Sequence, residues 1–249
     1  GNELQANYDS LGRRIWSSDP NLGVWTYTYD DGGNLVSYSD ARGVTTTNTY
    51  DILGRIVRRE STPPGGSGIE YGGAVTFTYD SGSYGKGKQS GMTDPSGSAT
   101  MSYDFKDRLV SDTKTIDGVA YTISRTYDFQ DRLASATYPG GDIAEYTYNN
   151  QGGVETLKYR PTAGSVITLV SNMQYNALGL VTRVEYGNGT ATDYSRNPLS
   201  LRPERTVTYA SGVAIQDLNY QFDPAGNLTR LTDAARSTTQ AFTYDDLNR

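Results

Sequence analysis

Apolar and polar residues alternate along much of this chain. In the segments 26–29, 76–79 and 145–148, an aromatic side chain occupies every second position between Thr or Glu residues. A period of two is typical of a β-strand with one face partly buried. The alternation resumes after a short turn, as in Leu228-Thr229-Arg230-Leu231. Strand, short glycine-containing turn and strand together predict a β-hairpin. We therefore expect an all-β chain of strands and turns, without a helix.

The hairpins recur as a repeat. Each copy begins with an aromatic residue (position one), usually followed by Asp or Asn (position two). Clear copies start at Tyr8-Asp9, Tyr29-Asp30, Tyr50-Asp51, Tyr79-Asp80, Tyr103-Asp104, Tyr127-Asp128, Tyr148-Asn149, Tyr175-Asn176, Phe222-Asp223 and Tyr244-Asp245. Their spacing is 21 to 29 residues, apart from one gap of 47 that contains the degenerate copy Tyr194-Ser195. A fixed period of this kind indicates a repeat architecture.

Position five of the repeat holds residues that tolerate a positive φ angle. It is Gly12, Gly33, Gly54, Gly152, Gly179 and Gly226 in six copies, and Asp107, Asp131 and Asn248 in three others. A left-handed conformation at position five would explain the choice of residue in all of these copies. The degenerate copy has Pro198 there, and proline cannot adopt that conformation. We therefore expect a different turn in that copy.

The neighbouring positions suggest how the repeats are held together. An Asx residue at position two can bond nearby backbone amides. Position six is Arg13, Arg55, Arg108, Arg132 and Arg249, with Asn34 and Asn227 in other copies. Position seven is apolar in most copies: Leu35, Ile56, Leu109, Leu133, Val154, Val181 and Leu228. If repeats stack, each Arg comes close to the Tyr rings and Asp carboxylates of its neighbours. We predict a ladder of cation–π contacts and ion pairs.

A second class of turn joins successive hairpins. Its members are Asp40-Ala41-Arg42-Gly43, Asp94-Pro95-Ser96-Gly97, Tyr138-Pro139-Gly140-Gly141-Asp142 and Tyr186-Gly187-Asn188-Gly189. These residues favour turns strongly. The stretches 61–73 and 81–91 are rich in Gly and Ser and are interpreted as enlarged loops. No change of composition marks a boundary, so we expect one domain over residues 1–249, an array of about ten to eleven repeats.

Composition supports this picture and excludes several functions. Only 35% of the 249 residues are apolar, yet there are 21 Tyr, and disordered chains are poor in aromatic residues. The absence of Cys and His excludes disulfides, a cysteine nucleophile, a histidine acid–base and the usual zinc sites. The net charge of −6 disfavours nucleic acid, and no segment is apolar enough to span a membrane. Because Gly1-Asn2-Glu3 resembles no signal peptide and the chain stops within a repeat at Arg249, we interpret it as a section truncated at both ends.

The motif Tyr50-Asp51-Ile52-Leu53-Gly54-Arg55-Ile56 resembles the YD repeat of the RHS family, and the segment 218–228 resembles a bacterial version. That family includes bacterial Rhs polymorphic toxins, shell proteins of insecticidal Tc toxins, and teneurins. The resemblance implies a β-strip that spirals into a hollow shell around a toxin segment, secreted or at the bacterial cell surface. The family's C-terminal self-cleaving segment has no match here, so the resemblance assigns no protease residue. For about ten repeats it implies an open, curved strip or a partial shell.

Three other functions fit the residue pattern less well than a structural one. Paired carboxylates could serve glycoside hydrolysis, but an Asp present in most repeats is explained by the repeat. The segment 30–34 superficially resembles a calcium loop but lacks the alternating oxygen ligands of an EF-hand. The Tyr residues, with Trp16 and Trp25, could form a carbohydrate platform. We therefore expect no enzyme, no catalytic residue, no cofactor and no metal. The main hypothesis is a structural shell module whose partner is an enclosed toxin or effector segment, or further repeats. The alternative is a cell-surface adhesion or carbohydrate-binding module.

Overall fold

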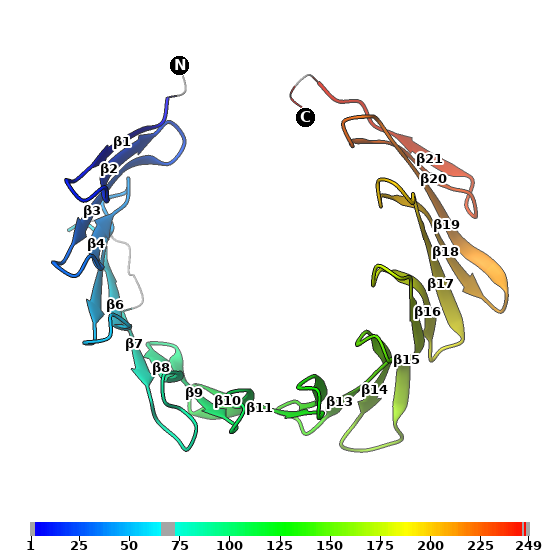
Figure 1. Ribbon diagram of the computed structural model, residues 1–249, viewed down its shortest axis with the longest axis horizontal. Helices are drawn as coiled ribbons and strands as arrows, with labels where there is room; N and C mark the ends of the chain where they lie inside the picture. Colours follow the sequence, from blue (N-terminus) through cyan, green and yellow to red (C-terminus); the bar gives the residue numbers. More distant parts are fainter. Residues whose placement is uncertain (1–2, 66–72, 246, 248–249) are drawn as a thin grey trace. The chain divides into compact units, whose positions relative to one another are not determined.

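The computed structural model describes residues 3–65, 73–245 and 247. These residues form 21 β-strands and no helix, which confirms the predicted all-β hairpin array. By their contacts the strands fall into two units, residues 1–124 and 125–249. Within each unit the strands follow one another in chain order (Figure 1). Whether residues 1–249 behave as one domain stays a prediction.

The first unit is an antiparallel meander in which each strand pairs with the next along the chain. Its strands are β1 (Gln5–Tyr8), β2 (Arg14–Asp19), β3 (Gly23–Tyr29), β4 (Leu35–Ser39), β5 (Thr45–Tyr50), β6 (Ile56–Thr62), β7 (Ala74–Tyr79), β8 (Gln89–Asp94), β9 (Gly97–Tyr103), β10 (Leu109–Ile116) and the first part of β11 (Val119–Tyr127). Strand β8 begins at Gln89, so the second enlarged loop ends earlier than its composition indicated.

The second unit has the same plan. After the last residues of β11 it contains β12 (Leu133–Thr137), β13 (Ile143–Tyr148), β14 (Val154–Arg160), β15 (Ile167–Tyr175), β16 (Val181–Tyr186), β17 (Thr190–Arg196), β18 (Pro203–Ala210), β19 (Val213–Phe222), β20 (Leu228–Asp233) and β21 (Thr238–Ala241). In both units the turns that follow position one join an odd-numbered strand to the next even-numbered strand. The other class of turn lies at the opposite ends of the strands.

The strand register gives the first unit two chemically different faces, because residues directly opposite in a sheet share a face. One face, here called the tyrosine face, includes Tyr27 opposite Tyr38, and Phe77 opposite Met92. The other, here called the hydroxyl face, consists mainly of small hydroxyl residues. Between β3 and β11 these are Thr26, Thr28, Ser37, Ser39, Thr45, Thr47, Thr49, Thr62, Thr76, Thr78, Thr93, Ser98, Thr100, Ser102, Ser111, Thr113, Thr115, Thr122 and Ser124.

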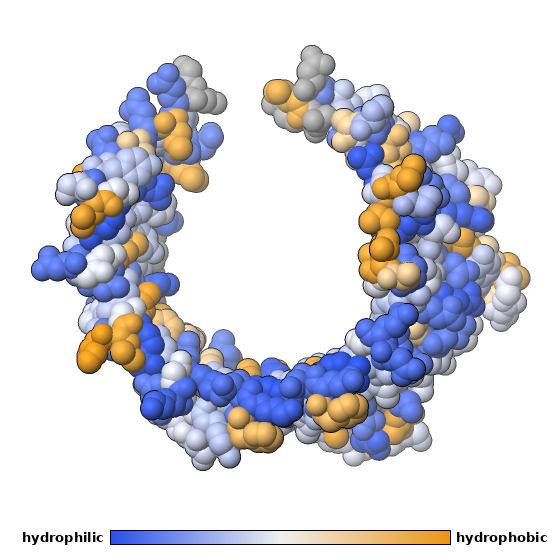
Figure 2. Space-filling view, in the orientation of Figure 1, coloured by the Kyte–Doolittle hydropathy of each residue, from blue (hydrophilic) through white to orange (hydrophobic). Residues whose placement is uncertain are grey.

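Among the residues that the structure describes, neither unit has a conventional core. The buried apolar residues there are only valines and alanines: Val44, Ala136, Ala144, Val170, Val184 and Val207. On the face seen in Figure 2, apolar residues form separate small groups among hydrophilic ones. Within the described parts of each unit, the strands in contact are consecutive ones. Cross-strand side-chain pairs and contacts between successive hairpins therefore hold each unit together.

Candidate functional site: the tyrosine–aspartate turn

The repeat motif folds as a three-residue hairpin loop. In the copy at 50–56, the Asp51 N–H donates to the Arg55 carbonyl (2.9 Å) and the Gly54 N–H donates to the Asp51 carbonyl (3.0 Å). Gly54 has a φ of 75°. A type I turn followed by a left-handed residue closes such a loop and leaves a bulge in the next strand. The bulge is present between β5 and β6, where Thr49 faces Arg58 but Tyr50 faces Ile56.

The left-handed position is conserved in geometry across the described turns. Gly12, Gly33, Gly152, Gly179 and Gly226 have φ between 75° and 99°, and Asp107 and Asp131 have φ of 67° and 65°. This confirms the explanation of position five. Asn248 and Arg249 lie outside the described residues.

The Asp side chain at position two stabilises its own turn. One oxygen of Asp51 accepts the N–H groups of Leu53 and Arg55 (2.9 Å each), and the other accepts Nε of Arg55 at 2.7 Å. These bonds, led by the one from the Arg55 backbone, lower the pKa of Asp51. Asp9, Asp104 and Asp128 make the same set of bonds. An ionised carboxylate occupied by its own turn is a structural acceptor rather than an acid or a nucleophile.

Amide side chains can take over this role. Asn149 and Asn176 accept two backbone N–H groups each at 2.9–3.0 Å, as the Asp residues do. Asp30 and Asp223 bond the side chains of Asn34 and Asn227 instead of an Arg. The calcium-like segment 30–34 is thus an ordinary repeat turn. In the described residues, no group of three or more acidic side chains could hold a metal ion.

The Tyr at position one joins its repeat to the preceding one. Tyr79 Oη donates to the Ile56 carbonyl at 2.7 Å, that is, to position seven of the copy before. The same bond, at 2.8–3.0 Å, joins these pairs: Tyr29 to Arg14, Tyr50 to Leu35, Tyr103 to Gln89, Tyr148 to Leu133, Tyr175 to Val154, and Tyr244 to Leu228. The hydroxyl therefore satisfies a carbonyl at the bulge, where the strand pairing is irregular.

The Arg at position six reaches forward to the following repeat. Its guanidinium carbon lies over the next Tyr ring in three copies: Arg13 over Tyr29 (4.8 Å to the centroid), Arg55 over Tyr79 (4.4 Å) and Arg132 over Tyr148 (4.3 Å). Arg55 also bonds both carboxylate oxygens of Asp80, at 3.1 and 2.6 Å. The predicted cation–π contacts are present in these copies, and the predicted ion pair with the next Asp is present for Arg55. In addition, Arg13, Arg55, Arg108 and Arg132 each form an ion pair with the Asp of their own turn.

One copy keeps this arrangement despite an enlarged turn. The Asp80 N–H donates to the Lys88 carbonyl at 3.0 Å, and the Asp80 carboxylate accepts the Gly87 N–H at 2.6 Å. Gly87 is left-handed (φ 79°), and Lys88 Nζ lies 5.3 Å from the Tyr103 ring centroid. Gly87 and Lys88 thus replace the glycine and arginine of the motif. Sequence reasoning missed them, although the order Gly87-Lys88-Gln89 before a strand was a usable signal.

The degenerate copy has a displaced turn, which agrees with the expectation from Pro198. Asn197 takes the part of position two: its N–H donates to the Arg202 carbonyl, and its carbonyl accepts the Leu201 N–H (2.9 Å each). Leu201 supplies the positive φ, 58°. Arg202 then lies 5.7 Å from the ring centroid of Phe222. The loop is one residue longer than usual, but the contact with the next repeat is kept.

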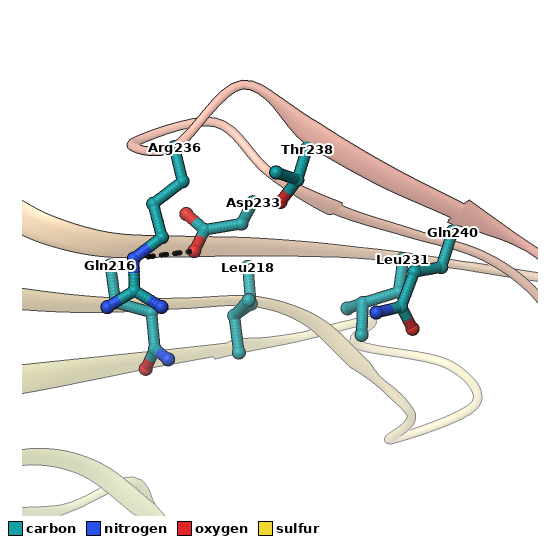
Figure 3. A pocket seen from close by; sticks show the side chains of 7 residues that line it. All are labelled: Gln216, Leu218, Leu231, Asp233, Arg236, Thr238 and Gln240. Atoms are coloured by element: carbon teal, nitrogen blue, oxygen red, sulfur yellow. Dashed lines mark ion pairs between the residues drawn. The ribbon is translucent and has the colours of Figure 1, made fainter.

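The other candidate chemistries find little support in the geometry. A cavity of about 320 Å³ in the second unit is lined by Gln216, Leu218, Leu231, Asp233, Arg236, Thr238 and Gln240 (Figure 3). Its one buried carboxylate, Asp233, accepts the N–H groups of Asp217 and Ala235. Trp25, which belongs to the alternative carbohydrate platform, stacks on Tyr38 with the ring centroids 6.1 Å apart. Among the described residues there is no helix that is long and apolar enough to cross a membrane.

Comparison with known proteins agrees with these features. The family description Teneurin YD-shell matches residues 73–249, and RHS Repeat matches residues 8–45. Because the first match covers more than half of the chain, the chain belongs to the teneurin YD-shell family. The suspected RHS/YD-repeat membership is thereby confirmed.

The relatives are much longer than this chain. It is 32% identical to toxin subunit YenC1 of Yersinia entomophaga over 104 residues, which are 39% of this chain and 11% of YenC1. It is also 32% identical to toxin subunit YenC2 of the same organism over 81 residues, or 30% of this chain and 8% of YenC2. The crystal structure of TcdB2-TccC3-Cdc42 matches 98% of this chain and 13% of its own chain, at 19% identity and a TM-score of 0.89. This last likeness shows a shared fold.

Proposed function

We propose that this chain is a wall segment of an RHS-type shell that encloses an attached toxin or effector polypeptide. Supporting this are the family membership, the toxin subunits among its relatives, and a fold shared with TcdB2-TccC3. The proposal includes a secreted bacterial protein without catalytic activity of its own. The chain spans only about a tenth of its matched relatives, so the enclosed segment belongs to the rest of such a protein.

The observation that carries the proposal is the contact between successive repeats. In seven copies the Tyr hydroxyl bonds the previous repeat, and in three an Arg covers the Tyr ring of the following one, so the array can extend by adding contacts of the same kind. A wall of any length can be built in this way without a thick core. Catalysis would instead require carboxylates free for chemistry, whereas the repeat Asp residues are occupied by their own turns.

Protease protection tests the proposal. The array is joined to its natural neighbouring segments, including the effector segment, and treated with a protease under native conditions. We expect the effector segment to survive, and to be digested once the array is opened by denaturant. The matched control is the effector segment expressed alone, which should be digested at once. Rapid digestion inside an intact assembly would contradict the proposal.

A further inference from the structure

The tips of the repeat turns carry large apolar side chains that the turns themselves do not require. The motif leaves positions three and four open, and turns of this kind favour small or polar residues there. In three turns of the first unit these positions instead hold Leu11, Ile52 with Leu53, and Phe105, and Ile52 is 98% exposed. Single exposed apolar residues are ordinary on protein surfaces, but these recur at one place in the repeat.

The second unit, taken by itself, has the same feature. Phe129, Leu178, Leu199 and Leu247 lie at the tips of four of its turns, and Phe129 is 85% exposed. We infer that these side chains and those of the first unit, here called the apolar tips, pack against the edge of another strip of repeats from the same protein. The two strips are then neighbouring coils of one wall. This inference rests on the proposed shell function, and it gives a role to the two positions that the motif leaves open.

The backbone beneath the tips can be buried without an unpaired donor. The N–H at position four donates to the side chain at position two, as from Leu53 to Asp51 (2.9 Å) and from Leu178 to Asn176 (3.0 Å). The Gly54 N–H donates to the Asp51 carbonyl within the same turn. A buried N–H group without a partner would cost free energy. Because these groups are already bonded, a tip can lose its water without that cost, and burial of its apolar side chain is favourable.

All the tips of a unit lie at the same edge of its sheet, because every repeat turn joins an odd-numbered strand to the next even-numbered one. Successive repeat turns are two strands apart, so they recur about every 10 Å along that edge. A partner with the same spacing contacts all of them at once, and another strip of these hairpins has that spacing. The structure of TcdB2-TccC3-Cdc42 matches this chain over 13% of its own length, so a shell protein of that size has the length for further strips.

The opposite edge of each unit is suited to receive the tips. Its turns consist mostly of small or polar residues. Beside these turns lie exposed apolar residues, Leu22 and Val119 in the first unit and Val166 and Val213 in the second. In a strip that winds in one direction, one edge of each coil faces the opposite edge of the next. The contact is therefore between unlike edges, and a contact of that type can be repeated from coil to coil.

Serine substitutions test the inference in the array joined to its natural neighbouring segments. The tip variants are Ile52→Ser combined with Leu53→Ser, and Phe129→Ser. The matched controls, Asp31→Ser and Asn150→Ser, change exposed polar residues at position three of other repeat turns. Each variant is also made in the isolated array, where the tips have no second strip to contact.

The tip variants should weaken the joined protein alone. We expect them to lower its thermal midpoint by several degrees, because apolar side chains buried between coils are lost. In the isolated array we expect the same midpoint as in the parent, since the side chains are exposed there and serine suits the turn, as Ser10 does in the first copy. The controls should leave both midpoints unchanged.

The outcomes separate the two proposals. If the effector segment is digested in the parent assembly, the shell function fails and the inference fails with it. If the effector is protected while the tip variants melt as the controls do, the inference is overturned and the shell function stands. A midpoint lowered equally in the isolated array would place the tips in contacts within one strip, which also overturns the inference. So would light scattering that shows a dimer of the joined protein dissociated by Phe129→Ser, because a second copy would then cover this edge.

Discussion

At the residue scale, Tyr-Asp and Gly-Arg act in different directions. Asp and Gly complete one hairpin loop, because the carboxylate accepts backbone N–H groups and the glycine supplies a left-handed conformation. Tyr bonds the hairpin before, and Arg covers the Tyr of the hairpin after. The four residue types Tyr, Asp, Gly and Arg therefore determine both the turn within a repeat and the contact between successive repeats.

Removing one Tyr hydroxyl should weaken the contact between two successive repeats, here called a junction. In Tyr148→Phe the Leu133 carbonyl loses its 2.8 Å hydrogen bond, while the ring under Arg132 is kept. We expect a loss of about 1 kcal/mol in local stability, which speeds amide hydrogen exchange in β13 about fivefold. Tyr121→Phe, at an exposed position, is the control and should leave exchange in its strand unchanged. Equal exchange in Tyr148→Phe and the parent would argue against the junction.

The left-handed position can be tested separately. Gly152 has a φ of 86°, and an added Cβ would meet nothing within 4 Å, so backbone conformation alone decides the outcome. We expect Gly152→Ala to cost about 1–2 kcal/mol of local stability at the β13–β14 hairpin, measured by hydrogen exchange. Gly152→Asn should cost clearly less, because Asn tolerates positive φ as Asp107 and Asp131 do. Equal losses in both variants would contradict this account.

At the scale of the elements, the ion pair between successive turns makes stability depend on pH. The Arg55 side chain, together with the Gly87 N–H, lowers the pKa of Asp80 from its usual 3.8 to about 2. A pKa lowered in the folded state stabilises the fold above about pH 4, and this contribution is lost as the pH falls toward 2.

Asp80→Asn isolates this contribution, since Asn also accepts the positive φ of residue 80 (65°). We expect the variant to have a lower thermal midpoint than the parent at neutral pH. The difference should shrink between about pH 4 and pH 2, as Asp80 becomes protonated in the parent. A difference that stays constant over this range would show that Asp80 stabilises the turn without its charge.

At the scale of the whole molecule, each hairpin depends mainly on its two neighbours. The strands in contact within each unit are consecutive, and the buried apolar residues are few and small. Stability in such an array is close to a sum of repeat and nearest-neighbour contributions. We therefore expect unfolding that is not two-state.

Calorimetry can check this expectation. The calorimetric enthalpy of unfolding should exceed the van't Hoff enthalpy, since parts of the array unfold independently. Opening one junction, as in Tyr148→Phe, should widen the gap between the two enthalpies. Equal enthalpies would indicate that the array unfolds as a single cooperative unit and would contradict this expectation.

The sequence by itself determined the hairpins, their turns and the family, because alternation and tolerance of positive φ are local properties of the chain. It also placed Arg near neighbouring Tyr and Asp residues, since a fixed repeat implies stacked copies. Only the tertiary structure decided that Tyr bonds the strand of the preceding repeat, that Gly87 and Lys88 stand in for Gly and Arg, and that Asn197 begins the displaced turn. These features depend on register and bulges between hairpins, which arise from packing across the sheet and are not written in the spacing of the motif.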